Sequence, residues 1–222
     1  MGSSFVLLMD SLEDRRKALN DINEGIRRCP DCDLSRTRTR PVPGEGPLDA
    51  EIMFIGEAPG YYEDQQGRPF VGAAGHFLEE LLASIGLKRT DVFIANVVKC
   101  RPPGNRDPLP AEIGACSKWL SQQIALLQPK LVVTLGRYSL ARFFPGTPIS
   151  RIHGQARKAA NQWVVPMYHP AAALHQGSLR QVIEEDFRKI TGYLDQARRE
   201  HQPAMEPVAA AAEPAPKQMT LL

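Results

Sequence analysis

The sequence predicts an α/β fold with three layers, in which helices cover both faces of a central, mostly parallel, four-stranded sheet. Two observations support this fold class. Four short apolar runs recur along the chain, and segments with apolar residues at helical spacing separate them. Strands that alternate with helices are typical of a parallel sheet, because each parallel connection needs a long crossover. The 222 residues, 43% of them hydrophobic, suffice for one buried core.

The predicted strands are continuous apolar runs, the pattern of strands that are buried on both faces of a sheet. They cover residues 50–56, a run that begins at Asp91, and residues 130–136 and 163–169. A loop of unusual local sequence follows each run, so we expect the chemistry of the protein at the carboxyl ends of these strands.

The predicted helices have recognisable start and stop signals. Ser11 and Asp14 match the capping-box pattern, and the apolar residues that follow keep helical spacing until Cys29 and Pro30 end the helix. A second helix around residues 78–85 is closed by glycine, and a third opens near Pro110 and continues to residue 127. The last helix is expected from about residue 178 to residue 200.

Overall charge identifies no partner. The chain carries 27 Lys and Arg residues against 25 Asp and Glu residues, a formal net charge of +2, so no bulk attraction to nucleic acid or to a membrane is expected. No run approaches the ~18 apolar residues of a membrane span, and no secretory signal pattern is present. We therefore expect no membrane association, a cytoplasmic location and a monomeric protein.

The four cysteines form two spaced pairs. Cys29 and Cys32 form a C-x2-C pair, and Cys100 and Cys116 form a C-x15-C pair. In a reducing compartment, cysteines used in this way indicate a metal site rather than disulfides. Four soft thiolates fit either tetrahedral zinc or an iron–sulfur cluster, and the number of ligands does not decide between them.

Polar residues interrupt or end three of the apolar runs. Glu57 opens the glycine-rich loop after the first run, Asn96 interrupts the second, and His169 ends the fourth, directly before Pro170. Glycines let the backbone approach a ligand closely, a buried amide needs partners, and a histidine can donate a hydrogen bond. Taken singly, each feature also fits a structural role as a tight turn, a turn-closing asparagine or a packed histidine.

Four motifs occur together and in a fixed order. Residues 56–60 read GEAPG, residues 69–72 read PFVG, residues 96–103 read NVVKCRPP and residues 169–172 read HPAA. In this combination the chain resembles family 4 uracil-DNA glycosylases, from Cys29 to the helix after His169. The resemblance implies a monofunctional enzyme of base excision repair that hydrolyses the N-glycosidic bond of uracil in DNA, releases free uracil and leaves an abasic site.

The resemblance also implies a role for each site residue. Phe70 would stack on the flipped base, and Asn96 would read O4 and N3–H of uracil. Glu63 would lie near C5, where it would exclude the methyl group of thymine. His169 would donate a hydrogen bond to O2 of the leaving base, and Glu57 would either oppose the cationic sugar or orient the attacking water. The cysteine spacing of the family implies a [4Fe-4S] cluster.

Other interpretations stay open at this point. The main alternative is a catalytically silent iron–sulfur module that binds nucleic acid, and a ferredoxin would explain the cysteines but not the motif loops. Without a substrate role, Phe70 would be a core residue, and Glu63 and Asp64 would form a solvated acidic turn. Arginines between residues 27 and 40 give a local excess of +3, which fits a phosphate track or a solvated loop.

A related branch of the superfamily becomes covalently linked to DNA through a histidine in the region that corresponds to residues 101–107. That segment contains no histidine here, so we expect the enzyme to turn over.

From Pro203 onward the sequence is rich in alanine and proline. This composition cannot build a core, so we expect residues 1–202 to form the folded domain and residues 203–222 to form a disordered tail. The last five residues, Gln218 to Leu222, resemble the short motif by which bacterial repair proteins bind the sliding clamp, although five residues also match by chance.

Overall fold

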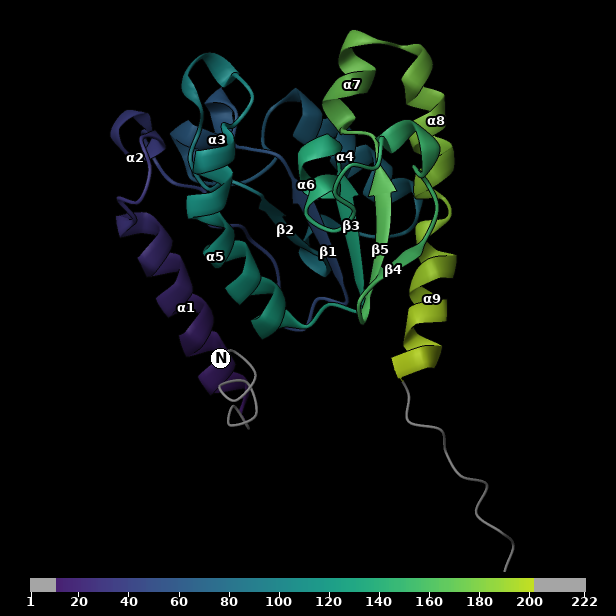
Figure 1. Ribbon diagram of the computed structural model, residues 1–222. Coiled ribbons are helices and arrows are strands. Elements are labelled where there is room, and N and C mark those ends of the chain that lie inside the picture. Colours follow the sequence, from purple (N-terminus) through teal and green to yellow (C-terminus); the bar gives the residue numbers. More distant parts are fainter. Residues whose placement is uncertain (1–10, 202–222) are drawn as a thin grey trace, which may run out of the picture.

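A five-stranded sheet crosses the middle of the molecule, and helices lie on both of its sides (Figure 1). The computed structural model describes residues 11–201. The sheet has the order β2-β1-β3-β5-β4, in which β4 alone is antiparallel to its neighbour. The strands are β1 (Ile52–Gly56), β2 (Phe93–Asn96), β3 (Leu131–Leu135), β4 (Arg157–Ala159) and β5 (Gln162–Met167).

All four predicted strands are present, and the predicted α/β fold class is confirmed. The predicted number of strands was one too low, because β4 adds a fifth at the edge of the sheet. β4 has three residues, is mostly exposed, and turns back onto β5 through Ala160, whose φ is 50°. An exposed edge strand this short has no apolar run, so hydrophobic patterning did not reveal it.

The long helices lie where they were predicted. They are α1 (Leu12–Arg28), α4 (Ala73–Ser84) and α5 (Pro110–Leu127), although α4 begins at Ala73, five residues before the first residue of the predicted pattern. The predicted cap of α1 is confirmed, since the hydroxyl of Ser11 accepts a hydrogen bond from the backbone N–H of Asp14 at 3.1 Å. Four short helices complete the loops, namely α2 (Leu34–Thr37), α3 (Tyr61–Gln66), α6 (Arg137–Ala141) and α7 (Pro170–His175).

The predicted last helix is in fact two helices, α8 (Ser178–Phe187) and α9 (Ile190–His201). The break falls at Arg188 and Lys189, where the sequence contains neither proline nor glycine. Phe187 and Ile190 flank the break, and both are fully buried in the core. These two side chains pack into the core on either side of the turn. No pattern in the local sequence indicates that the helix breaks there.

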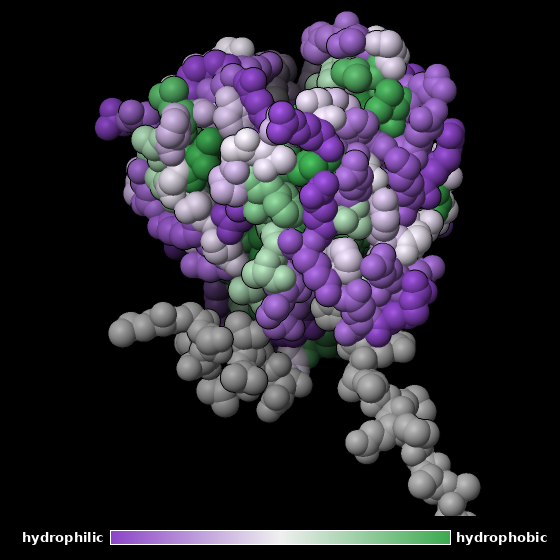
Figure 2. Space-filling view, turned by 45° about the vertical axis from the view of Figure 1, so that its right-hand side comes forward, coloured by the Kyte–Doolittle hydropathy of each residue, from purple (hydrophilic) through white to green (hydrophobic). Residues whose placement is uncertain are grey.

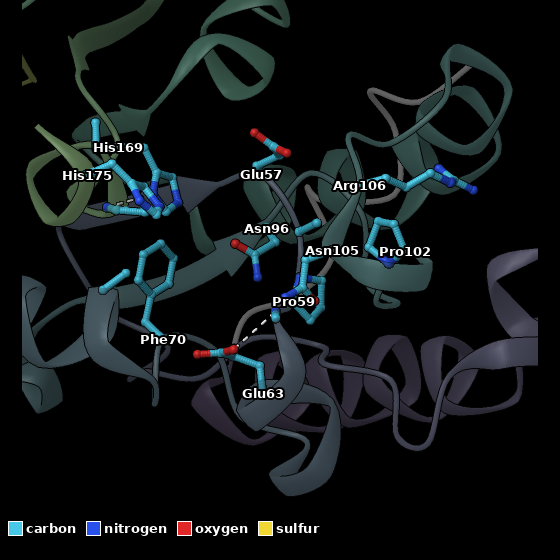
Figure 3. Close-up of a pocket in the computed structure, with 15 residues that line it drawn as sticks. Glu57, Pro59, Glu63, Phe70, Asn96, Pro102, Asn105, Arg106, His169 and His175 are labelled. Atoms are coloured by element: carbon cyan, nitrogen blue, oxygen red, sulfur yellow. Dashed lines mark hydrogen bonds between the residues drawn. The ribbon is translucent and has the colours of Figure 1, made fainter.

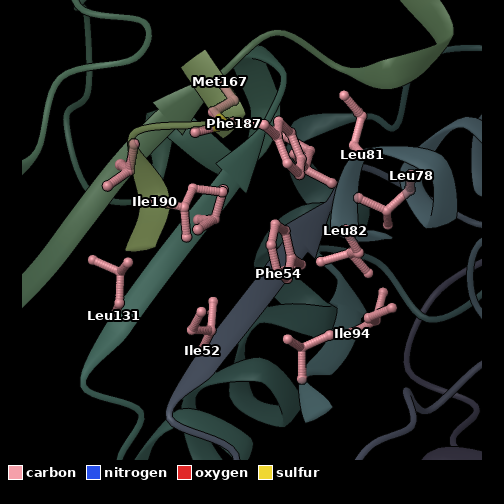
Figure 4. Packing of buried hydrophobic residues seen from close by; sticks show 14 of the residues in the cluster. Ile52, Phe54, Leu78, Leu81, Leu82, Ile94, Leu131, Met167, Phe187 and Ile190 are labelled. Carbon is pink, nitrogen blue, oxygen red and sulfur yellow. The ribbon is translucent and has the colours of Figure 1, made fainter. Parts of the chain in front are cut away.

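Two apolar clusters, one on each face of the sheet, hold the three layers together. On one face, alternate residues of the parallel strands pack against α4, α8 and α9, with Phe54 stacked on Phe187 at 5.8 Å between ring centroids (Figure 4). On the other face, the remaining residues of the same strands pack against α1 and α5. Strands buried on both faces explain why their sequences are continuously apolar.

The expected domain boundary and the expected tail, residues 203–222, lie outside the described residues. Hydrophilic side chains predominate on the face of the molecule seen in Figure 2, and hydrophobic ones show only in small patches. Between residues 11 and 201, no helix combines the length and apolar character that a membrane crossing requires.

Candidate functional site

A pocket of about 440 Å³ opens at the carboxyl ends of β1 and β2, where the loops after the strands meet (Figure 3). A volume of this size accommodates a small organic ligand. The pocket is lined by all five side chains that the sequence predicted for the substrate site, namely Glu57, Glu63, Phe70, Asn96 and His169. It is also lined by residues that sequence analysis did not identify, among them Pro102, Asn105, Arg106 and His175.

Asn96 points into the middle of the pocket from the end of β2, where it pairs with Gly56 of β1 (Figure 3). Its Oδ1 is buried and has no hydrogen-bond partner among the described residues. A β-carbon at Gly56 would overlap this oxygen and would lie 2.7 Å from the ring of Phe70, so glycine is required there. An unpaired buried carbonyl oxygen costs about 1–3 kcal/mol, which a ligand N–H would recover.

The ring of Phe70 forms a wall of the pocket and stacks on the imidazole of His169, with 5.5 Å between ring centroids. The backbone of Phe70 has a φ of 51°, a left-handed conformation that costs a residue other than glycine about 1–2 kcal/mol. Arg89 stabilises this conformation. Its Nη1 donates to the carbonyl oxygen of Phe70 at 2.7 Å, and its Nη2 donates to the carbonyl oxygen of Pro69.

Arg89 was missed by sequence analysis because nothing in its local sequence distinguishes it from a surface arginine. Its side chain is only 13% exposed, and its Nε pairs with Glu45 at 2.5 Å. Glu45 also accepts two hydrogen bonds from Arg68, at 2.8 and 3.0 Å. These ion pairs hold the loop that carries Phe70 against the segment around Glu45.

Glu63 connects two loops of the pocket wall. Its Oε1 accepts the backbone N–H groups of Val71, at 2.8 Å, and Gly72, at 2.9 Å, while its Oε2 accepts that of Gly60 at 3.0 Å. The neighbouring Asp64 is 2% exposed and accepts the N–H of Thr39 at 2.9 Å. The alternative of a solvated acidic turn is therefore wrong, because both carboxylates have backbone partners.

His169 caps the short helix α7 and faces the pocket as a neutral donor. Its Nδ1 accepts the backbone N–H of Ala171 at 3.1 Å, so the proton of the neutral ring is on Nε2. Burial lowers the pKa of His169 to about 4, and the carboxylate of Glu63 acts in the opposite direction. The imidazole is therefore uncharged at neutral pH.

Glu57 follows β1 directly and lies across Asn96 from Glu63 (Figure 3). Burial raises the pKa of Glu57, the charge of Asp107 raises it further, and Arg137 opposes the rise. In contrast to Glu63, the carboxyl group of Glu57 has no hydrogen bond or ion pair within residues 11–201. It is therefore the carboxylate of this pocket that is free to act on a ligand or on water.

The four cysteines line a second, small cavity between α1, α5 and the loop after β2, as the sequence predicted. Cys29 ends α1, Cys116 lies within α5, and Cys32 and Cys100 lie in loops. Over the described part of the chain, no three His, Cys, Asp or Glu side chains gather closely enough to hold a single metal ion. The four cysteines therefore line one small cavity, and their positions form no site for a single ion.

Three of these sulfur atoms accept hydrogen bonds from the protein. The indole Nε1 of Trp119 donates to Cys29 at 3.3 Å. The guanidinium of Arg38 donates to Cys100 at 3.1 Å, and the backbone N–H of Lys99 donates to Cys116 at 3.2 Å. Burial raises the pKa of Cys100, and raises that of Cys116 to about 11, while these donors act in the opposite direction. A bound metal would supply the positive charge that the thiolate forms need.

The arginines between residues 27 and 40 lie mostly on the surface, where several form exposed ion pairs. Arg27, Arg28 and Arg36 pair with acidic residues on their own helical turns. Arg38 contacts the cysteine cavity. Arg27 and Arg28 share the one carboxylate of Glu24, and Arg40 is exposed and makes no ion pair among the described residues, so a local excess of positive charge remains.

Comparison with known proteins defines the class. The model of the uracil DNA glycosylase superfamily matches residues 43–193, which include the pocket and two of the cysteines. Several relatives carry the name type-4 uracil-DNA glycosylase, among them proteins of three organisms. The protein of Sulfurisphaera tokodaii is 50% identical over 82% of this chain and 84% of its own length. The protein of Archaeoglobus fulgidus is 47% identical over 78% of this chain and 92% of its own length. The protein of Thermotoga maritima is 41% identical over 81% of this chain and 96% of its own length.

This chain therefore belongs to the uracil-DNA glycosylase superfamily and, within it, to the type-4 family. The resemblance seen in its sequence motifs is confirmed. The alternative of a catalytically silent binding module is not favoured, since these relatives are named as glycosylases and the five predicted pocket residues lie together.

Proposed function

We propose that this protein is a monofunctional DNA glycosylase of base excision repair, which hydrolyses the N-glycosidic bond of uracil in DNA, releases free uracil and leaves an abasic site. The observation that carries this proposal is the buried, unpartnered Oδ1 of Asn96, a residue that lines the pocket. Uracil presents N3–H, a donor that satisfies this oxygen. Cytosine presents an acceptor at N3, which leaves the oxygen unpaired and repels it.

Phe70 and Glu63 complete the recognition of the base. The target nucleotide must leave the base stack to enter the pocket, and stacking on the ring of Phe70 offsets part of that cost. Glu63 stands near C5 of the base, where a thymine methyl group would meet it. Its three backbone N–H partners, on Gly60, Val71 and Gly72, keep this wall from moving aside.

His169 and Glu57 act on the bond that breaks. As the bond to the sugar breaks, negative charge grows on O2 of the base, and the neutral Nε2–H of His169 donates to that oxygen. Positive charge grows on the sugar at the same time. Glu57 has no competing hydrogen bond or ion pair among the described residues, so its carboxylate stabilises that charge or orients the attacking water.

The test is uracil excision from matched single-stranded oligonucleotides that contain one uracil, thymine or cytosine, followed by alkali to cut any abasic site. We expect alkali-dependent cleavage at uracil alone. Cleavage without alkali would contradict the monofunctional assignment. No cleavage by correctly folded protein with its metal bound would instead support a silent binding module.

The cysteine cavity, we propose, holds a [4Fe-4S] cluster. The spacing of the four cysteines resembles that of the type-4 family, and the four thiols line one cavity, where each would bind a different iron of such a cluster. When bound, the cluster supplies a structural cross-link between α1, α5 and the loop that follows Asn96. Iron and sulfide analysis should find about four irons per chain, with broad absorbance near ~400 nm. Colourless protein with one zinc per chain would refute it.

We propose further that Gln218 to Leu222, which lie outside the described residues, bind the sliding clamp. Deletion of these five residues should weaken binding to the clamp and leave excision of uracil from short oligonucleotides intact. Unchanged affinity for the clamp would rule this out. We also propose a cytoplasmic location and a monomer, because four unpaired thiols require a reducing environment and the pocket is complete within one chain.

A further inference from the structure

Two adjacent tyrosines stand exposed at the edge of the pocket. Tyr61 is 52% exposed and Tyr62 is 60% exposed, which is unusual for side chains of this size. They open α3, directly after Gly60, which lines the pocket. The core does not use these rings, and their position beside the pocket suggests contact with whatever extends out of it.

The two rings are held in place and are not free to rotate independently. Their centroids are 5.5 Å apart, edge to face at 81°. Arg101, from the loop after β2, places its guanidinium carbon 5.1 Å from the centroid of the Tyr61 ring. Arg101 is itself oriented by a hydrogen bond from its Nε to Oδ1 of Asn105, at 2.7 Å. The aromatic surface is therefore prepared before any ligand arrives.

The charge of Arg101 is available to a ligand. Among the described residues it makes no ion pair, whereas Arg106 pairs with Glu112 at 2.7 Å and Arg137 pairs with Asp107. An exposed ring beside an unpaired guanidinium matches a nucleotide, because the ring stacks on the base and the guanidinium binds the phosphate. Proteins that bind single-stranded nucleic acid combine these same two features.

We infer that Tyr61 stacks on the base next to the flipped uridine in single-stranded DNA, while Arg101 binds the phosphate that joins the two nucleotides. This inference rests on the proposed function. It extends the site from one nucleotide to two, and it makes an unpaired neighbour part of the preferred substrate. In a duplex the neighbouring base stays paired and stacked on its other side, so it is less able to turn toward Tyr61 than the same base in a single strand.

The test uses the full-length protein with its metal bound and three single-stranded oligonucleotides that each contain one uracil. One has normal neighbours, and the others have a tetrahydrofuran spacer, which lacks a base, directly 5′ or directly 3′ of the uridine. On the normal oligonucleotide, Tyr61→Ala should lower kcat/KM by about five- to hundredfold. On one of the two spacer oligonucleotides, Tyr61→Ala should lower kcat/KM by less than about twofold, because the base that Tyr61 would contact is missing.

Controls separate stacking from folding. Leu12→Ala removes another exposed apolar side chain, far from the pocket on α1, and should leave all three rates unchanged. Tyr61→Phe keeps the ring, so its kcat/KM should change with the position of the spacer as that of the unsubstituted protein does. An equal loss for Tyr61→Ala on all three oligonucleotides, or a loss below twofold on the normal one, would overturn the inference. If the unsubstituted protein released no uracil from any of them, the proposed function would fail instead.

A separate experiment, the salt dependence of kcat/KM, tests the role of Arg101. Replacement by glutamine removes one phosphate contact, so the slope of log kcat/KM against log salt concentration should become shallower by about 0.7 for single-stranded DNA. An unchanged slope would remove Arg101 from the inference. The matched control is Arg180→Gln on α8, whose guanidinium already pairs with Glu80 and Glu184.

Discussion

The ring of Phe70 and the imidazole of His169 lie nearly parallel, at an interplanar angle of 24° and with 5.5 Å between their centroids. In the proposed function, Phe70 stacks on the base and His169 stabilises the base as it leaves. Because the two rings stack, a shift of the loop that carries Phe70 would also change the surroundings of the imidazole. The contacts of Arg89 with the backbone of that loop therefore affect both steps.

Arg89→Met should lower uracil excision about tenfold or more and lower the free energy of unfolding by about 1–3 kcal/mol. The substitution leaves the carbonyl oxygens of Pro69 and Phe70 without their donor. Excision kinetics and urea unfolding measure the two effects. The matched control is Arg68→Met, which also loses a bond to Glu45 but contacts neither carbonyl and is 54% exposed. Equal effects of the two substitutions would contradict the special role of Arg89.

Gly56→Ala should abolish most of the activity, because the added methyl group would displace the amide of Asn96 or the ring of Phe70. We expect a loss of about 1–3 kcal/mol in the free energy of unfolding, measured in urea. Gly114→Ala in α5 is the comparison, since its methyl group would meet nothing within 4 Å. It should stabilise the protein by about 0.5–1 kcal/mol. Full activity of Gly56→Ala would refute the packing argument.

The imidazole of His169 should titrate near pH 4 in the folded protein, with the proton of the neutral ring on Nε2. Nitrogen-15 NMR of the ring reports both quantities. In the unfolded chain the same group titrates near 6.5, so the unfolded state binds the extra proton first. His169 should therefore make the protein less stable as the pH falls from about 6.5 to about 4, by at most about 3 kcal/mol. A ring that stays protonated at neutral pH, or a neutral ring with its proton on Nδ1, would exclude the neutral-donor mechanism.

Glu57 should set the acidic limit of activity. Its pKa is raised mainly by burial, so the active carboxylate should become protonated above pH 4.5, where an exposed glutamate is still charged. The rate of excision under single-turnover conditions should therefore fall with a midpoint above 4.5. Glu57→Gln should lower the rate at neutral pH and remove this dependence. If Glu57→Gln kept the same acidic midpoint, another group would be responsible for the fall in rate at low pH.

Asn96→Ala and His169→Ala should each lower excision by about 100-fold or more, because each removes a polar contact that no neighbour replaces. The absorbance of the metal site should stay unchanged in both variants, since neither side chain contacts a cysteine. Asn20→Ala, an exposed asparagine on α1, is the control and should behave as the unsubstituted protein. Near-normal rates in both pocket variants would overturn the assignment of the site.

The sequence by itself determined the layered fold, the approximate positions of the long helices and, through the family resemblance, five of the residues that line the pocket. These features follow from local patterns: apolar runs predict β1, β2, β3 and β5, and the motif loops follow three of those strands. Because parallel strands end at a common edge, Glu57, Asn96 and His169 meet there even though they are far apart in the chain.

Only the tertiary structure decided how the loops are held. The left-handed backbone of Phe70, its support by Arg89 and the three N–H contacts of Glu63 depend on how separate segments pack together. The same is true of the break between α8 and α9. Hydrogen bonds and close packing between distant segments have no periodicity, so they leave no pattern in the local sequence, and they set the geometry on which the chemistry of this pocket depends.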